Sequence, residues 1–132
     1  MAVEIELEPR LLLAIDDEPA ILEVVQTCLE ITSSWRVVGV GTGQEGLVLA
    51  EQCRPDGILL DISLPDLSGF EVLEKLRAKP TTQTIPVILL TANVQRTELG
   101  RYSTLQIAGI LAKPFDPLRL APQIATYLGW SL

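Results

Sequence analysis

The stretch Gly57-Ile-Leu-Leu-Asp61-Ile-Ser-Leu-Pro65-Asp-Leu-Ser-Gly69 passes from a short apolar run into a carboxylate, and then into a loop that contains proline and glycine. An uninterrupted apolar run before turn residues is typical of a parallel strand covered on both faces, because neither face needs polar side chains. Asp61 would then stand at the carboxyl end of the strand, where open α/β sheets bind their ligands. The simpler alternative is that Asp61 only stabilises the turn, since Asp is a common turn residue.

Four further segments have the same apolar character and alternate with helical patterns. The predicted strands cover residues 11–15, 35–40, 86–91 and 109–113 in addition to the central one. The predicted helices begin after Pro19, at residue 47, after Gly69, at residue 94 and after Asp116, and the second and fourth end at residues 53 and 108. Pro122 should kink the last helix or delay its start. Five strands alternating with five helices predict an α/β fold with a doubly wound, five-stranded parallel sheet and helices on both faces.

Length and composition restrict the class of protein. A chain of 132 residues is about one domain, and 48% hydrophobic with 20% charged residues is typical of a globular protein. No apolar run approaches the roughly 18 residues of a membrane span and no secretory leader is visible, so we expect no membrane association. The net charge of −7 argues against nucleic-acid binding. Cys28 and Cys53 lack the spacing of a redox or zinc motif, and we expect two small buried side chains in a reduced, cytoplasmic protein.

Short segments remain at both ends of the predicted domain. Residues 1–9 alternate apolar residues with glutamate, which is a strand period, but their terminal and acidic character favours a loosely attached arm. Residues 10–128 would form the domain, and residues 129–132 a C-terminal tail. We therefore expect a single domain without an attached DNA-binding or catalytic output domain.

The segment Gly41-Thr-Gly43-Gln-Glu-Gly46 matches the G-x-G-x-x-G pattern of dinucleotide-binding sites, and Asp61 follows at the spacing of the ribose-binding acid. That pattern normally lies in the first strand-to-helix turn of its unit, whereas a complete strand and helix precede it here. The favoured interpretation is that the glycines serve a turn and close packing. Titration with a nicotinamide or flavin cofactor would test the dinucleotide alternative.

Polar residues follow four of the predicted strands, and parallel strands bring their carboxyl ends to one edge of a sheet. Close carboxylates repel one another unless a cation joins them, and a donor set made of oxygens suits Mg²⁺. The chain has no histidine, which excludes imidazole metal ligands and a Ser-His-Asp triad. The set favours phosphoryl chemistry, with an aspartate as nucleophile and a lysine and a hydroxyl on the phosphoryl oxygens. Its members are Asp16, Asp17, Asp61, Thr91 and Lys113.

These residues, in this order and at these separations, resemble the receiver domains of two-component response regulators. The D-x-x-x-P-x-x-x-G pattern from Asp61 to Gly69 and the run Lys113-Pro114-Phe115 belong to the same resemblance. It implies a flavodoxin-like fold and phosphorylation of Asp61 by a sensor histidine kinase or a histidine phosphotransfer protein. It also implies that Thr91 contacts the phosphoryl group together with Lys113, and that the Lys113–Pro114 peptide is cis. The implied Mg²⁺ ligands are Asp17, Asp61, Asp16 through water, and the carbonyl of Ser63.

The resemblance has one departure that affects the expected output. Many relatives carry Tyr or Phe three residues before the lysine, where this chain has Ile110, although the small residue expected after the threonine is present as Ala92. We expect a signalling domain rather than a turnover enzyme, with a downstream protein target on the face formed by residues 94–108, the fifth strand and the last helix. Two alternatives stay open: Ile110 simply packs in the core, or the chain is a receiver-like interaction module that is never phosphorylated.

Overall fold

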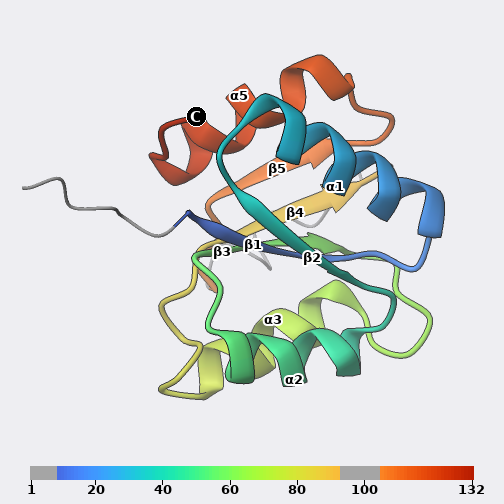
Figure 1. Cartoon of the computed structure of the whole chain (residues 1–132). Coiled ribbons are helices and arrows are strands. Elements are labelled where there is room, and N and C mark those ends of the chain that lie inside the picture. Colours follow the sequence, from blue (N-terminus) through green and yellow to red (C-terminus); the bar gives the residue numbers. More distant parts are fainter. Residues whose placement is uncertain (1–8, 93–104) are drawn as a thin grey trace, which may run out of the picture.

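The computed structural model describes residues 9–92 and 105–132 of the chain. Their strands pair in parallel throughout, in the order β2-β1-β3-β4-β5, so the strand that ends in Asp61 lies at the centre of the sheet (Figure 1). This confirms the predicted five-stranded parallel sheet. The strands are β1 (Leu11–Ile15), β2 (Arg36–Val40), β3 (Gly57–Asp61), β4 (Val87–Thr91) and β5 (Gly109–Ala112).

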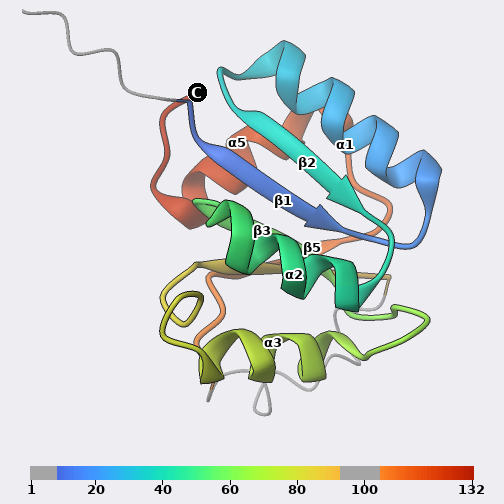
Figure 2. The same ribbon diagram turned by 60° about the horizontal axis from the view of Figure 1, so that its bottom comes forward.

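Helices cover both faces of the sheet, which confirms the doubly wound arrangement. Figures 1 and 2 show α1 and α5 on one face and α2 and α3 on the other. Each face buries its own apolar cluster, and the strands contribute alternate residues to the two clusters. Within the described ranges, none of the helices is long and apolar enough to cross a membrane. The helices are α1 (Pro19–Thr32), α2 (Gly43–Cys53), α3 (Gly69–Ala78) and α5 (Pro117–Leu128).

Helix α2 begins four residues before its predicted start at residue 47. Thr42 caps it by accepting the Glu45 N–H at 3.1 Å. Two glycines occupy the first turns because there is no space for a side chain: a Cβ on Gly43 would lie 2.9 Å from Val72 Cγ2, and one on Gly46 would collide with Ile15. The glycines therefore serve close helix packing, and it was wrong to treat them as residues outside the helix.

Pro122 does not delay the last helix, contrary to one of the two effects expected of it. α5 begins at Pro117, directly after Asp116, whose Oδ1 accepts the Leu118 N–H at 2.9 Å. Pro122 removes one hydrogen bond to the carbonyl of Leu118, but that residue is 79% exposed and its surroundings are open to water. The buried face of Leu120, Ala121 and Ile124 is left intact.

The helix predicted over residues 94–108 falls mostly outside the described residues, as does the arm predicted over residues 1–9, of which only Pro9 is described. Residues 105–108 are not helical. Arg77 of α3 holds this segment: it donates to Leu105 O at 2.8 Å and to Gln106 O at 3.3 Å. It also donates to Ile85 O at 2.8 Å and to Gln83 O at 3.2 Å, so one guanidinium joins the residues before β4 to those before β5.

The last four residues pack against the domain. Trp130 is 9% exposed, and its ring meets that of Trp35 edge-on at 5.0 Å between centroids. Trp35 Nε1 donates to Ser131 O at 2.9 Å, and Ser34 N–H donates to Leu132 O at 3.0 Å. This end of the chain thus covers the apolar cluster between α1 and α5 where β2 begins.

The two cysteines are free, but neither is buried as expected. Cys53 is exposed because it is the last residue of α2, beyond the packed part of that helix. Cys28 is half-buried at the contact between α1 and α5, where its Sγ donates to Pro117 O at 2.6 Å.

Candidate functional site

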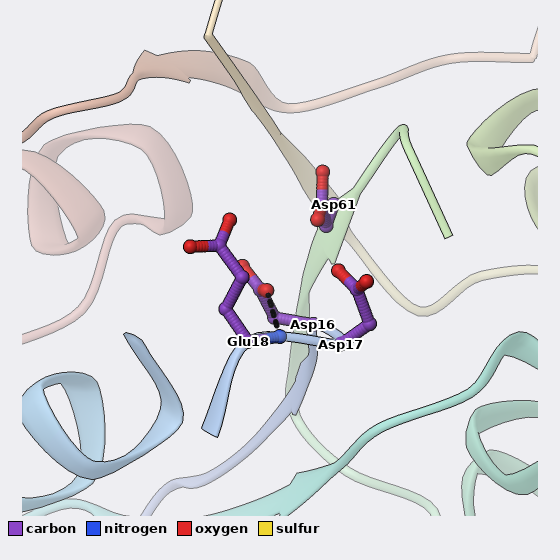
Figure 3. A group of neighbouring side chains, drawn as sticks. All are labelled: Asp16, Asp17, Glu18 and Asp61. Carbon is purple, nitrogen blue, oxygen red and sulfur yellow. Dashed lines mark hydrogen bonds between the residues drawn. The ribbon is translucent and has the colours of Figure 1, made fainter. Parts of the chain in front are cut away.

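Two buried carboxylates occupy the carboxyl edge of the sheet. Asp61 is the last residue of β3, and Asp16 directly follows β1. These strands pair with Ile15 opposite Leu60, so Asp16 and Asp61 stand at the same level, 2% and 4% exposed. Figure 3 shows the exposed Asp17 and Glu18 on the same loop, with their carboxylates gathered around this edge. Carboxylates buried this deeply need hydrogen bonds and a counter-charge.

Each buried carboxylate uses one oxygen to brace its own loop. Asp16 Oδ1 accepts the Glu18 N–H at 2.9 Å, and this bond is drawn as a dashed line in Figure 3. Asp61 Oδ1 accepts the Ser63 N–H at 3.0 Å. Asp61 therefore does stabilise its turn, as the simpler alternative held. That role uses only Oδ1 of Asp61. The other oxygen, Oδ2, contacts Lys113.

Lys113 supplies the counter-charge. It follows β5, and its backbone N–H donates to Thr91 O at 2.8 Å. Its Nζ lies 2.8 Å from Asp16 Oδ2, 3.1 Å from Glu18 Oε1 and 3.2 Å from Asp61 Oδ2. The Lys113–Pro114 peptide is cis, as predicted. The structure thus joins the ends of β1, β3 and β5 around one ammonium group.

Burial and pairing shift two pKa values in this cluster. Burial raises the pKa of Asp16 above its ordinary value, and hydrogen bonds from Lys113 and from the Glu18 N–H offset this only in part. Burial alone would lower the pKa of Lys113, but the hydrogen bonds to Asp16 and Glu18 and the charge of Asp61 outweigh it and raise that pKa. Lys113 therefore stays charged, while Asp16 remains incompletely stabilised as an anion.

The acidic residues fit a divalent cation. One carboxylate oxygen from each of Asp16, Asp17, Glu18 and Asp61 lies within 4.8 Å of the others. Asp16 Oδ2 is buried, and within the described residues its partner is the Lys113 ammonium at 2.8 Å. A set of oxygen donors with access to water suits Mg²⁺. A cation here would add positive charge beside the buried carboxylates, which Lys113 alone stabilises incompletely.

The other predicted site residues lie at this edge or just behind it. Thr91 ends β4 and is 5% exposed, and the exposed Ala92 follows it. Ser63 is exposed and pairs with Ser68 in an isolated bridge that closes the loop after β3. Ile110 lies two residues before the end of β5 and packs, half-buried, against the cluster covered by α2 and α3.

Two acidic residues that were not predicted as functional have defined contacts, Glu18 within the site and Asp66 at the start of α2. Glu18 contacts Lys113, and the signal in the sequence was a run of acids longer than a helix cap needs. Asp66, in the loop after β3, accepts the N–H groups of Gly43 and Gln44, each at 2.9 Å. The N–H groups of Gln44 and Gly43 hold the pKa of Asp66 below its ordinary value.

The contact of Asp66 with α2 also decides the meaning of the G-x-G-x-x-G pattern. The first four N–H groups of α2 all have partners, namely the two oxygens of Asp66, the Thr42 hydroxyl and the Thr42 carbonyl. A helix start binds a phosphate only through N–H groups that are free. The chain's own carboxylate therefore fills the position that a dinucleotide phosphate would need.

Comparison with known proteins agrees with this geometry. A family model described as the response regulator receiver domain matches residues 12–125. The polar-differentiation response regulator DivK of Brucella anthropi is 31% identical over 121 residues, which cover 92% of this chain and 98% of that protein. The DNA-binding dual master transcriptional regulator RpaA of Synechocystis is 37% identical over 120 residues, covering 91% of this chain and 49% of that protein. The chain spans about half or less of the length of several curated regulators that it matches.

A solved structure with the same fold carries a metal. The receiver domain of the sensor histidine kinase PA1611 from Pseudomonas aeruginosa PAO1 superposes with a TM-score of 0.81 at 29% identity, over 92% of this chain and 99% of that one. It is described with a magnesium ion coordinated in its active-site cleft.

Proposed function

Because the chain belongs to the response regulator receiver domain family, we propose that Asp61 accepts a phosphoryl group from the phosphohistidine of a sensor histidine kinase or a histidine phosphotransfer protein. The observation that supports this most directly is the position of Asp61. It ends the central strand, is 4% exposed, and has its Oδ2 at 3.2 Å from Lys113 Nζ. Two-component signalling is the context that the family provides.

The transfer requires one nucleophile and groups that stabilise negative charge. A carboxylate oxygen of Asp61 attacks phosphorus while the phosphorus–nitrogen bond of the phosphohistidine breaks. The electron pair of that bond returns to the imidazole, whose other nitrogen keeps a proton, so the ring leaves neutral. The product is an acyl phosphate on Asp61. Hydrolysis later restores the carboxylate, so the chain acts as a phosphoacceptor rather than as an enzyme that turns over a substrate.

Lys113 would exchange its carboxylate partners for phosphoryl oxygens. Its Nζ already lies within 3.2 Å of both Asp16 Oδ2 and Asp61 Oδ2, so a small displacement is enough. The hydroxyl of Thr91 would approach from the end of the neighbouring strand. When bound, Mg²⁺ neutralises the negative charge that the carboxylates and the phosphoryl group accumulate. The proposed ligands are Asp17, Asp61, the Ser63 carbonyl, and Asp16 through water.

The output is proposed to be docking of a downstream protein on the face of β5 and α5, together with residues 94–108. Ile110 has no ring to swing between an exposed and a buried position, and it packs, half-buried, against the core. Tyr127 of α5 donates its hydroxyl to Ile110 O at 3.1 Å, which ties α5 to β5. A displacement of the backbone next to Thr91 is therefore the proposed signal, in place of an aromatic switch.

Intact-mass measurement after incubation with a small phosphodonor and Mg²⁺ tests the acceptor. The parent chain should gain one phosphoryl group, and Asp61→Asn should gain none. Asp56→Asn is the matched control, because Asp56 lies at the opposite edge of the sheet and Asn keeps an oxygen that can accept the Leu11 N–H. Labelling of Asp61→Asn at the level of the parent would overturn the assignment. A parent chain that is never labelled would instead support an interaction module that is not phosphorylated.

A further inference from the structure

A concave site lies at the edge of the sheet opposite to the acidic cluster, where β1 and β2 begin and α2 ends. It is a pocket of about 580 Å³ whose lining includes Arg10, Arg36, Arg54 and Asp56. In Figure 1 this edge is on the left, where β1 starts and where α2 leads into β3. The volume falls within the range of small-molecule sites. None of these residues belongs to the acidic cluster around Asp61.

Backbone hydrogen bonds hold the segments that carry the three arginines. Arg36 N–H donates to Arg10 O at 2.8 Å, and Asp56 N–H donates to Leu11 O at 2.8 Å. Asp56 Oδ2 in turn accepts the Leu11 N–H at 2.8 Å. The beginnings of β1 and β2 and the turn after α2 are therefore joined directly by hydrogen bonds.

Two of the arginines show additional constraints. The guanidinium carbon of Arg10 lies 5.6 Å from the ring centroid of Trp130, which is itself packed against Trp35. This stacking restrains the guanidinium plane and leaves the N–H groups on its edge available. Arg54 has φ of 46°, a left-handed conformation that glycine adopts with less strain. This conformation is common just after a helix, and Arg54 N–H donates to Ala50 O at 3.2 Å, so the backbone that carries this arginine is fixed.

The pocket has an excess of positive charge that the described part of the chain does not neutralise. Among residues 9–92 and 105–132, no ion pair reaches Arg10, Arg36 or Arg54. Asp56 is the one carboxylate of the lining, and one of its oxygens already accepts the Leu11 N–H. Three arginines are grouped in one pocket although the chain has a net charge of −7. Like charges around one concavity repel, and a bound anion would relieve that repulsion.

We propose that this pocket binds a small ligand through a phosphate or pyrophosphate group. Guanidinium groups form paired, charge-assisted hydrogen bonds to phosphate oxygens and stay protonated. Three arginine residues in the lining of one pocket match the several negative charges of a pyrophosphate. A long polyanion fits less well, because the basic groups line a concavity and the chain as a whole is acidic. Binding here is separate from phosphorylation at Asp61.

Titration of the full chain with pyrophosphate in the presence of a chelator tests the proposal, because the chelator removes metal that would draw pyrophosphate to the acidic cluster. NMR signals of the arginine Nε–H groups and of the Trp130 indole should shift saturably at one site. Inorganic phosphate and ADP are the further probes. If ADP binds more tightly than pyrophosphate, the ligand is the phosphate group of a nucleotide. If ADP binds equally or more weakly, the ligand is the free anion. Shifts confined to the Lys113 edge, or no saturable binding of any of the three probes, would overturn the proposal.

Substitutions separate this pocket from general attraction to positive charge. Arg36→Gln and Arg54→Gly should each weaken pyrophosphate binding about tenfold, the effect of losing a charge-assisted hydrogen bond. Arg54→Gly is the sharper variant because glycine suits the φ of 46° and leaves the fold in place. Arg119→Gln, on the exposed side of α5, is the matched control and should bind like the parent. Equal losses in the control and in the pocket variants would contradict a defined site.

Discussion

The two edges of the sheet carry opposite charges and satisfy them differently. At the carboxyl edge, Asp16 and Asp61 are buried, and Lys113 Nζ lies 2.8 Å and 3.2 Å from their oxygens. At the amino edge, the pocket arginines, Arg36 among them, are exposed and lack an ion pair within the described residues. A buried charge without a partner costs several kcal/mol, whereas an exposed one costs little. The buried edge therefore contains its own counter-charge, and the exposed edge leaves that role to a ligand.

This difference determines what a ligand does at each edge. At the carboxyl edge, the phosphoryl group of the proposed reaction would compete with Asp16 and Asp61 for Lys113, so its binding would replace existing contacts. At the amino edge, an anion would add contacts and displace no ion pair among the residues that the structure describes. An exchange of partners can be transmitted to the strands that hold them, because the ammonium leaves one carboxylate when it binds another group. The carboxyl edge is thus suited to switching, and the amino edge to binding.

Lys113→Met should have the largest effect on stability. It removes the ammonium from two buried carboxylates, and loss of one partner of a buried ion pair costs about 3 kcal/mol. The free energy of unfolding, from urea denaturation at neutral pH, is the quantity to measure. Combination with Asp16→Asn should recover much of the loss, since that variant removes a carboxylate left without its partner. An unchanged free energy of unfolding in Lys113→Met would mean that solvent, and not Lys113, stabilises these carboxylates.

The sequence predicts the carboxyl edge well because its residues follow directly from strand order. Apolar runs locate the strands, parallel pairing brings their ends together, and Asp16, Asp61, Thr91 and Lys113 are simply the residues that come next. The first turns of α2 were missed for a physical reason: glycine is unfavourable in an isolated helix, and only the packing of Gly43 and its neighbours explains its presence.

Contacts between loops were beyond the reach of the sequence pattern. The bonds of Asp66 to α2, the four carbonyls around Arg77 and the grouping of three arginines all depend on where loops meet in the fold. Periodicity reports which residues face a core, but it does not report which polar groups meet at its margin. The described C-terminal residues illustrate the same limit, since Trp130 is buried by residues from distant parts of the chain, Trp35 among them.

Arg77→Met and Arg36→Gln compare the stability contribution of a half-buried arginine with that of an exposed arginine. Arg77 is half-buried and donates to four backbone carbonyls, so its loss should lower the free energy of unfolding by about 2 kcal/mol. The side chain of Arg36 has no such partner among residues 9–92 and 105–132, and its substitution should change the free energy of unfolding by less than about 0.5 kcal/mol. Urea denaturation of both variants provides the test. Comparable losses in the two would show that Arg36 is a structural residue, which would weaken the case for a ligand-binding role.

The smallest expected effect concerns Asp66, an anion that the chain supplies to its own helix. It is exposed, and its two oxygens accept the N–H groups of Gly43 and Gln44. Its pKa is lowered from the ordinary value of 3.8, so its contribution to stability is present above that pH and is lost as pH falls through the folded-state pKa. Asp66→Asn keeps one accepting oxygen but removes the charge. The unfolding midpoint of the parent should therefore fall more steeply in acid than that of the variant, and the two curves should converge there.

Asp116→Asn is the control, because an Asn cap stabilises a helix as well as Asp does. Parallel curves for the parent and Asp66→Asn across the acid range would show that solvent serves the start of α2 as well as this carboxylate.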